Sequence, residues 1–228
     1  MSNAAKCLAA VRTRMKAAAT AASRRVDELR LIAVGKTFGA ERIAELAAAG
    51  QRDFGENYLD EALEKIRALH EHPIRWHFIG PLQSNKTRAV AEHFDWVHSV
   101  DREKIARRLS AQRPPALGEL SVCVQVNISG ESSKSGVAPD RAAALCEAVA
   151  ACPNLRLVGL MAIPDPDRDA GTQYRALAEL REALRTRGHD MNVLSAGMSG
   201  DLEQAVAHGA THLRIGTALF GARAPRPG

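Results

Sequence analysis

The chain has 228 residues and a mass of 24.5 kDa, which is enough for one large domain or two small ones. Hydrophobic residues make up 46% and charged residues 25%, a globular composition that excludes disorder along the whole chain. No apolar stretch approaches the ~20 residues of a membrane-spanning helix, so we expect no membrane partner.

The net charge of +5 permits an anionic partner. The basic residues are scattered along the chain, and aromatic residues make up only 4%, which leaves little to stack on bases. We therefore expect no nucleic-acid binding and favour a small phosphorylated ligand.

The four cysteines form no CxxC pair and do not cluster with histidines at zinc-binding spacing. They are Cys7, Cys123, Cys146 and Cys152. This pattern is typical of reduced thiols in a cytoplasmic protein, and it predicts no metal site.

Residues 1–26 contain six basic residues and no acidic one. Such a segment is either a mitochondrial transit peptide or an amphipathic helix. We favour the helix, because apolar residues recur on one face of it, at Leu8, Val11, Met15, Ala18 and Ala19.

Eight β-rich runs follow, and each except the last is followed by a helical pattern. The runs are 31–34, 53–55, 76–79, 96–99, 122–126, 157–161, 192–194 and 212–215. The repeat of about 26 residues is the minimum length of a βα unit. We therefore predict an α/β fold, a (β/α)8 TIM barrel forming a single domain over residues 1–228. It would carry an extra N-terminal helix over 1–26 and a loose tail over 222–228. An open doubly wound sheet is the alternative.

In such a barrel the functional groups gather at the carboxyl ends of the strands. Lys36 stands directly after the first predicted strand. It is either a solvated lysine or an amine that forms an imine with an aldehyde.

Two loops after the seventh and eighth strands are typical of a phosphate site. The first, residues 195–201, is rich in small residues, and Ser199 is expected to cap the next helix. In the second, residues 214–221, Gly216 and Thr217 offer backbone amides. Two phosphate-binding loops opposite a lysine suggest a phosphorylated aldehyde, of which pyridoxal 5′-phosphate (PLP) is the commonest.

Several longer motifs match one family. They are 33–37 (AVGKT), 54–58 (FGENY), 76–86 (WHFIGPLQSNK), 127–129 (NIS), 134–136 (KSG), 159–163 (GLMAI), 197–199 (GMS) and 214–217 (RIGT). Over about residues 25–223 the chain resembles the pyridoxal phosphate homeostasis proteins, single-domain relatives of the alanine racemase N-terminal barrel.

The resemblance implies a role for six residues in cofactor binding. Lys36 would hold PLP as an imine. Ser199, Gly216 and Thr217 would bind its phosphate, Arg214 would face the pyridine nitrogen, and Asn57 would lie near the ring hydroxyl. Gly35 and Ala196 depart from the family pattern, in which we expect a serine and a bulkier residue; this affects loop rigidity more than cofactor binding.

Three further residues in the matching motifs have open interpretations. His77 is interpreted as a hydrogen-bonded residue of the barrel, with acid–base chemistry as the alternative. Asn85 lies in a polar loop that either gates the site or caps the next helix. Lys134 is interpreted as a solvated lysine, with a second amine that receives or releases PLP as the alternative.

We expect a protein that holds PLP for intracellular homeostasis and supply, without robust catalysis, and we assign no catalytic residue. An arginine facing the ring nitrogen disfavours its protonation and weakens the cofactor as an electron sink. The resemblance also implies that racemases take a second base from an added β-domain, for which residues 218–228 are too few. We expect a cytoplasmic monomer whose partners are PLP and apo forms of PLP-dependent enzymes.

Two other functions stay open. The first is a genuine PLP-dependent amino-acid enzyme, a slow racemase, lyase or transaminase, with His77 or Tyr58 as proton donor. The second is a barrel that binds another phosphate ester without imine chemistry.

Overall fold

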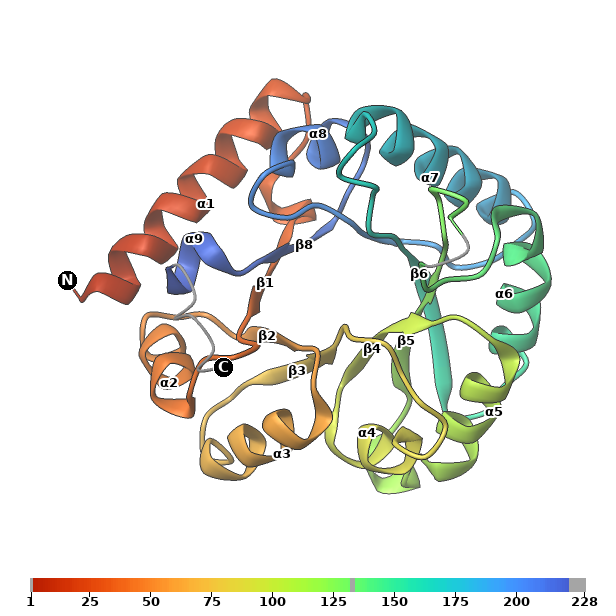
Figure 1. The fold of residues 1–228 in the computed structure, drawn as a ribbon, viewed down its shortest axis with the longest axis horizontal. Coiled ribbons are helices and arrows are strands. Elements are labelled where there is room, and N and C mark those ends of the chain that lie inside the picture. Colours follow the sequence, from red (N-terminus) through yellow and green to blue (C-terminus); the bar gives the residue numbers. More distant parts are fainter. Residues whose placement is uncertain (1, 132–133, 222–228) are drawn as a thin grey trace.

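The computed structural model describes residues 2–131 and 134–221, so the predicted tail over 222–228 lies outside the described residues. Eight parallel strands close into one barrel in chain order, as predicted (Figure 1). They are β1 (Arg30–Val34), β2 (Asp53–Glu56), β3 (Arg75–Phe78), β4 (Trp96–Val100), β5 (Leu120–Gln125), β6 (Leu155–Met161), β7 (Val193–Ser195) and β8 (His212–Ile215). The closure joins β1 to β8, where Ala33 lies opposite Ile215.

Helices surround the barrel. They are α1 (Asn3–Ala21), α2 (Ala40–Ala48), α3 (Leu59–Ala68), α4 (Thr87–His93), α5 (Glu103–Gln112), α6 (Ala142–Ala150), α7 (Ala170–Arg185), α8 (Leu202–Ala207) and α9 (Thr217–Phe220). Three short 3₁₀ turns complete the list: η1 (Val26–Glu28), η2 (Pro115–Leu117) and η3 (Pro139–Arg141). No helix of the described ranges is long and apolar enough to cross a bilayer.

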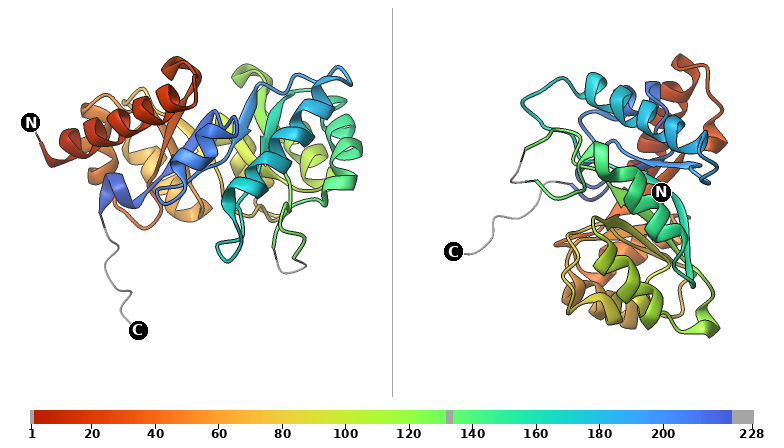
Figure 2. Two further views of the ribbon diagram at one scale, coloured as in Figure 1. Left: turned by 90° about the horizontal axis from the view of Figure 1, so that it is seen from above. Right: turned by 90° about the vertical axis from the view of Figure 1, so that its right-hand side faces the viewer.

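The N-terminal helix is shorter than predicted. It ends at Ala21, and Ser23 takes a positive φ of 53°, which turns the chain towards β1. Arg24 then donates to the carbonyls of Val206 and Ala210, which fixes this turn against the barrel. The predicted apolar face is confirmed: it is buried, and α1 packs along the outside against α2, α8 and α9 (Figure 2).

The expectation that no helix follows the last strand is wrong. The single turn α9 follows β8 directly, and its Phe220 stacks on Phe38 with ring centroids 4.8 Å apart. A four-residue helix leaves no periodic pattern in a sequence, which is why periodicity missed it.

The apolar core has two parts. A large cluster fills the space between the strands and the helices. A small one, formed by Cys123, Val158, Met161 and Val193, lies inside the barrel beside β5, β6 and β7. The opposite part of the interior is polar, which is unusual because branched apolar side chains commonly fill such barrels.

Candidate functional site

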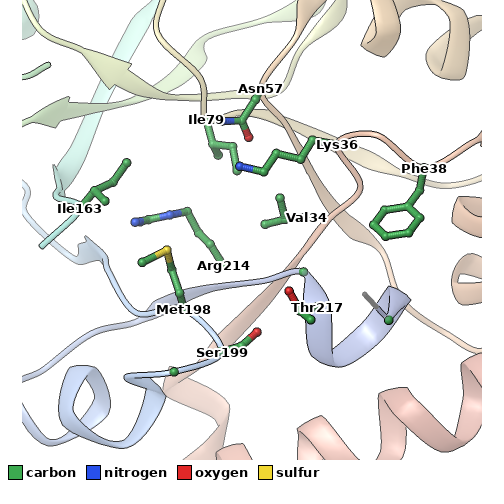
Figure 3. A pocket seen from close by; sticks show the side chains of 13 residues that line it. Val34, Lys36, Phe38, Asn57, Ile79, Ile163, Met198, Ser199, Arg214 and Thr217 are labelled. Atoms are coloured by element: carbon green, nitrogen blue, oxygen red, sulfur yellow. The ribbon is translucent and has the colours of Figure 1, made fainter. Parts of the chain in front are cut away.

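A cavity of about 270 Å³ opens at the carboxyl ends of the strands. All six predicted cofactor-binding residues line it: Lys36, Asn57, Ser199, Arg214, Gly216 and Thr217. In Figure 3, Lys36 and Asn57 lie on one side, the Ser199 and Thr217 hydroxyls on another, and the Arg214 guanidinium between them. Residues up to 181 positions apart in the chain thus share one concave site, because the barrel brings its strand ends together.

The turn that carries Lys36 is held from below by α3. The ammonium of Lys65 donates to the Gly35 carbonyl at 2.8 Å, and the Thr37 amide donates to Glu61 Oε1 at 2.6 Å. Thr37 has a φ of 70°, in the left-handed region that non-glycine residues rarely adopt. The contacts on both sides of Lys36 therefore fix the direction in which its side chain leaves the strand end.

Lys65 itself is buried against a carboxyl group. Its Nζ lies 2.8 Å from Oε1 of Glu56, which is fully buried, and the second oxygen of Glu56 has no partner within residues 2–131 and 134–221. Burial raises the pKa of Glu56 to about 7, although the nearby Lys65 acts in the opposite direction. Near neutral pH, the carboxyl group of Glu56 therefore carries a proton part of the time.

The same carboxyl group explains the departure at Gly35. A Cβ atom at position 35 would lie 2.4 Å from Ile43 Cδ1 and 2.7 Å from Glu56 Oε1. These two side chains occupy the space that a serine would need. Ile43 and Glu56 therefore pack directly against the backbone of Gly35, which is possible because this residue has no side chain.

The expectation that Ser199 caps the next helix is wrong. Helix α8 begins at Leu202, and its N-cap is Asp201, whose carboxylate accepts bonds from the Met198 amide at 2.6 Å and the Tyr174 hydroxyl at 2.7 Å. Gly197, with a φ of 91°, passes so close to α8 that a Cβ would lie 2.6 Å from Ala205. Ser199 lies two residues before the cap and lines the cavity instead.

The second loop starts a helix at the cavity. Gly216 is the N-cap of α9 and Thr217 its first residue. The first amides of a helix have no acceptor within the helix, so they are available to an anion. Ser199, Gly200, Gly216 and Thr217 together make one small-residue wall of the cavity.

Arg214 is buried and held by two hydrogen bonds. Its Nη1 donates to Ser195 Oγ at 2.8 Å and its Nη2 to the Ala162 carbonyl at 2.9 Å. Ser195 Oγ lies 2.8 Å from His98 Nδ1, and His98 Nε2 lies 2.9 Å from His77 Nδ1. His77 Nε2 ends the chain of contacts at Asp53 Oδ1, 3.1 Å away. A polar chain thus crosses the barrel from Asp53 at one end to Arg214 at the other.

The charged ends determine every proton in this chain. Burial would raise the pKa of Asp53, but bonds from His77 and Arg75 outweigh it and hold the pKa below its usual range. An ionised carboxylate only accepts, so His77 Nε2 carries a proton.

The two histidines are neutral. Burial lowers the pKa of His77, and burial together with the positive charge of Arg214 lowers the pKa of His98. The His77 Nδ1 therefore accepts from His98 Nε2–H, and His98 Nδ1 accepts from the Ser195 hydroxyl. The Ser195 oxygen is left as the acceptor that Arg214 requires, so all donors point away from Arg214 and towards Asp53.

The interpretation of His77 as a hydrogen-bonded barrel residue is therefore confirmed; its exposed fraction is zero and it does not line the cavity. Asn85 does not cap α4, whose N-cap is Lys86. Lys134 forms ion pairs with Glu131 at 3.1 Å and Asp165 at 3.4 Å, so it is paired rather than simply solvated. It lines a neighbouring cavity of about 180 Å³.

Sequence reasoning missed the apolar part of the site. Phe38, Ile79, Ile163 and Met198 line the cavity, and Ile163 and Met198 are 44% and 39% exposed. Their only signal is a position just after a strand, which an apolar core residue shares. His98 was missed as well, because a polar residue inside a strand does not reveal its partner. Ser195 was assigned to the predicted phosphate loop 195–201, whereas it is the last residue of β7.

Comparison with known proteins gives the class first. A family model for the alanine racemase N-terminal domain matches residues 7–224, so the chain belongs to that family. An alanine racemase from Corynebacterium glutamicum has the same fold, with a TM-score of 0.68 at 18% identity, over 96% of this chain and 62% of that one.

Within that class the chain belongs to the pyridoxal phosphate homeostasis proteins. The protein of that name from Pseudomonas aeruginosa is 58% identical over 223 residues, 98% of this chain and 97% of that one. The one from Escherichia coli is 51% identical over 229 residues, 98% of each chain. PipY from Synechococcus elongatus, solved with PLP bound, has a TM-score of 0.79 at 34% identity, over 96% of this chain and 100% of that one.

Proposed function

We propose that this protein binds PLP through Lys36 and holds it for supply to other enzymes, without robust catalysis of its own. The observation that carries the proposal is the convergence of Lys36, Arg214 and the two small-residue loops on one cavity of about 270 Å³. The relative PipY, whose structure was solved with PLP bound, also supports the proposal.

The residues of the cavity fit the cofactor. Asn57 Oδ1 is buried and has no hydrogen-bond partner among the described residues, so it is ready to accept from a ring hydroxyl. Ser199 and Thr217 supply hydroxyls, and the start of α9 supplies amides, at the place where barrels commonly bind phosphate. When bound, PLP supplies an aldehyde that condenses reversibly with an amine. Lys36 is the amine that the cavity offers.

Two features favour holding over catalysis. With PLP bound, Arg214 would place a positive charge beside the ring nitrogen and would disfavour protonation of that nitrogen. Among the described residues that line the cavity, the titratable side chains are Lys36 and Arg214. A racemase needs a second acid–base group on the other face of its substrate, and His77, one candidate for it, lies inside the barrel.

The first experiment locates the attachment. The protein is mixed with PLP, its visible absorption is recorded, borohydride makes the bond permanent, and peptide mass identifies the modified lysine. We expect a yellow protein modified at Lys36, and no modification in Lys36→Ala. Label spread over surface lysines would overturn the proposal.

Lys134→Ala is the matched control. Although burial acts in the opposite direction, the bonds with Glu131 and Asp165 raise the pKa of Lys134, which makes it a poorer nucleophile than an unpaired amine. We expect Lys134→Ala to take up PLP as the unchanged protein does. Loss of uptake in this variant alone would assign the amine to Lys134.

The second experiment separates carrier from enzyme. PLP-loaded protein is mixed with an apo PLP-dependent enzyme, and recovery of that enzyme's activity is followed; we expect recovery from the loaded protein. Amino-acid turnover above that of free PLP, lost in Lys36→Ala, would instead show catalysis. The four cysteines are free thiols, and we propose that the protein acts in the cytoplasm as a monomer. Light scattering tests the oligomeric state.

A further inference from the structure

Two cavities open at the amino ends of the strands, on the side of the barrel away from Lys36. Their volumes are about 640 and 610 Å³, and they share Glu28, Arg30 and His212. Arg30, Arg75 and His212 are the first residues of β1, β3 and β8, which places both cavities at this end of the barrel. Neither cavity contains a residue of the PLP site proposed above.

The positive charge of the protein is concentrated here. The linings of the two cavities include nine Lys and Arg residues and four Asp and Glu residues. The whole chain has 31 basic and 26 acidic residues, so 22 of each kind remain elsewhere. The entire net charge of +5 is thus accounted for by the residues around these two cavities.

The cavity of about 610 Å³, termed here the arginine cavity, is the more one-sided of the two. Its basic residues are all arginines: Arg24, Arg30, Arg156, Arg181 and Arg185, against the two acids Glu28 and Asp190. Arginine is the residue that recognises phosphate and carboxylate groups with two parallel hydrogen bonds. A cavity lined by arginine rather than lysine therefore favours specific binding of a small oxyanion over non-specific electrostatic attraction of any anion.

Among the described residues, three of these arginines form no ion pair with an acid that lines either cavity. Arg24 pairs with Glu28 and Arg30 with Asp53. Arg156 donates to the Ser121 hydroxyl at 3.0 Å and Arg181 to the Gly209 carbonyl at 3.3 Å, both of which are uncharged. Arg185 pairs with Glu182, where both side chains are about half exposed and the interaction is screened.

Two buried polar atoms on the lining residues also have no partner. Only four buried side-chain atoms in the described part of the chain are unsatisfied, and two of them are Arg181 Nε and His212 Nε2. Both residues line the arginine cavity, and His212 is only 7% exposed. A buried polar group without a partner costs free energy, so such groups are rare and commonly mark a binding site.

The charges around these groups repel one another. Burial lowers the pKa of Arg181, and the positive charges of Arg185 and Arg24 lower it further. An anion among these three arginines would relieve that repulsion.

We propose that the arginine cavity binds a compact anion with two phosphoryl groups, as inorganic pyrophosphate or as the diphosphate of a nucleotide. Phosphoryl oxygens match the arginine donors, and a multiply charged anion matches the local excess of three positive charges. A concave site with buried donors suits a small ligand better than a nucleic acid, whose phosphates lie along an extended surface.

Titration calorimetry with inorganic pyrophosphate at constant ionic strength tests this. The protein is first loaded with PLP and reduced, so that the other phosphate site is filled. We expect saturable one-to-one binding that Arg181→Gln weakens at least tenfold. Arg187→Gln is the matched control, because it removes the same charge from an exposed position that lines neither cavity.

Arg185→Gln is a second test variant, which keeps the proposal testable if Arg181→Gln fails to fold. Arg185 is half exposed and lines the same cavity, so its replacement should not disturb the fold. We expect it to weaken binding as well. A parallel titration with ADP distinguishes the two candidate ligands. Equal affinities for ADP and pyrophosphate indicate that the cavity binds free pyrophosphate, and tighter binding of ADP indicates a nucleotide.

Heats no larger than those of a sodium chloride titration would overturn the proposal, as would equal weakening by Arg187→Gln. The test also survives failure of the proposed function. If the protein takes up no PLP, the titration is performed without loading, and dependence on Arg181 and Arg185 still identifies the arginine cavity.

Discussion

Arg214 connects the cavity at the mouth of the barrel with the polar chain inside it. Its guanidinium lines the cavity, and its Nη1 begins the series of hydrogen bonds through Ser195, His98 and His77 to Asp53. Because the carboxylate at the far end fixes each proton, the Ser195 oxygen is always an acceptor towards Arg214. The chain thus holds the guanidinium in one orientation.

Ser195→Ala removes that acceptor. We expect a loss of about 1–3 kcal/mol in the free energy of unfolding, because a charged donor and His98 Nδ1 both lose a partner in the protein interior. We also expect PLP affinity to fall several-fold, measured from the visible absorption on titration with PLP.

Ser99→Ala is the control for this substitution. Ser99 is buried and donates to the Gly80 carbonyl at 2.6 Å, outside the polar chain. We expect it to lower stability without altering the affinity for PLP. Equal affinities of all three proteins for PLP would show that the polar chain does not position Arg214.

Single residues divide clearly into those that the sequence predicts and those that it does not. Lys36 and Thr217 lie two residues after predicted strands and Ser199 lies five residues after one, so the barrel prediction also places them at the cavity. Ser195 and His98 lie within strands, where alternation indicates an inward side chain but not which of the other inward residues it meets. Their contact joins positions 97 residues apart, which no local pattern encodes.

At the level of elements, α3 supports the turn that carries Lys36. Lys65 and Glu61 contact both sides of that turn, and Glu56 lies beneath it. The pKa of Glu56, about 7, exceeds its ordinary value of 4.5. Between these two values the folded protein retains a proton that the unfolded chain has lost, so this group lowers stability as pH rises.

Glu56→Gln removes this titration. We expect the variant to gain stability relative to the unchanged protein between pH 4.5 and 8, by up to about 3 kcal/mol. Urea unfolding at pH 5 and at pH 8 measures the difference. A difference in unfolding free energy that is the same at both pH values would contradict the assigned pKa.

Helix α1 supports the other side of the cavity. Its Arg14 donates to the Ser199 carbonyl at 2.7 Å and forms a two-bond ion pair with Glu203 of α8. From its position outside the barrel, Arg14 thus holds the loop that is predicted to bind the phosphate.

We expect Arg14→Ala to weaken PLP binding a few-fold with little effect on overall stability, because exposed ion pairs contribute at most about 1 kcal/mol. Absorption titration and thermal unfolding measure the two effects. Lys6→Ala, an exposed position on the same helix, is the control. A large fall in melting temperature with unchanged PLP affinity would assign Arg14 a purely structural role.

Elements with a clear period were predicted within a few residues, as the eight strands demonstrate. The errors fall where tertiary contacts decide the boundary. Arg24 fixes the end of α1 by bonding to carbonyls near α8, and Asp201 replaces Ser199 as the cap because Tyr174 and the Met198 amide hold it. A sequence shows that a serine is able to cap, but not which residue the packing places there.

For the molecule as a whole, the regular alternation of strands and helices predicted the closed barrel and therefore the location of the candidate site. The same alternation could not predict the arginine cavity at the amino ends of the strands. The arginines of the arginine cavity come from the segment after α1, from β1, from β6 and from α7, and each alone resembles an ordinary surface charge. Only closure of the barrel brings them together.

The polar interior of the barrel has a consequence for the stability of the whole molecule in acid. His77, His98 and His212 are buried, and burial lowers the pKa of each; that of His212 falls to about 3. In the unfolded chain each histidine takes up a proton below its ordinary pKa of 6.5. The folded protein then binds fewer protons than the unfolded chain, so their contribution is fully present above pH 6.5 and is lost as pH falls.

His212, whose pKa falls to about 3, contributes a loss of roughly 1.4 kcal/mol per pH unit below pH 6.5, and His77 and His98 act in the same direction. Glu56 opposes this with one proton between pH 4.5 and 7, so the contributions of His77 and His98 determine the net loss as pH falls. Because domains are commonly stable by only about 5–15 kcal/mol, we expect this loss to lower the urea midpoint measurably. Urea unfolding at pH 7.5, 6.5 and 5.5 tests this: the midpoint should fall steeply only in the second interval. His98→Gln should make that fall shallower, whereas equal midpoints at pH 6.5 and 5.5 would show that the histidines take up protons within the folded barrel.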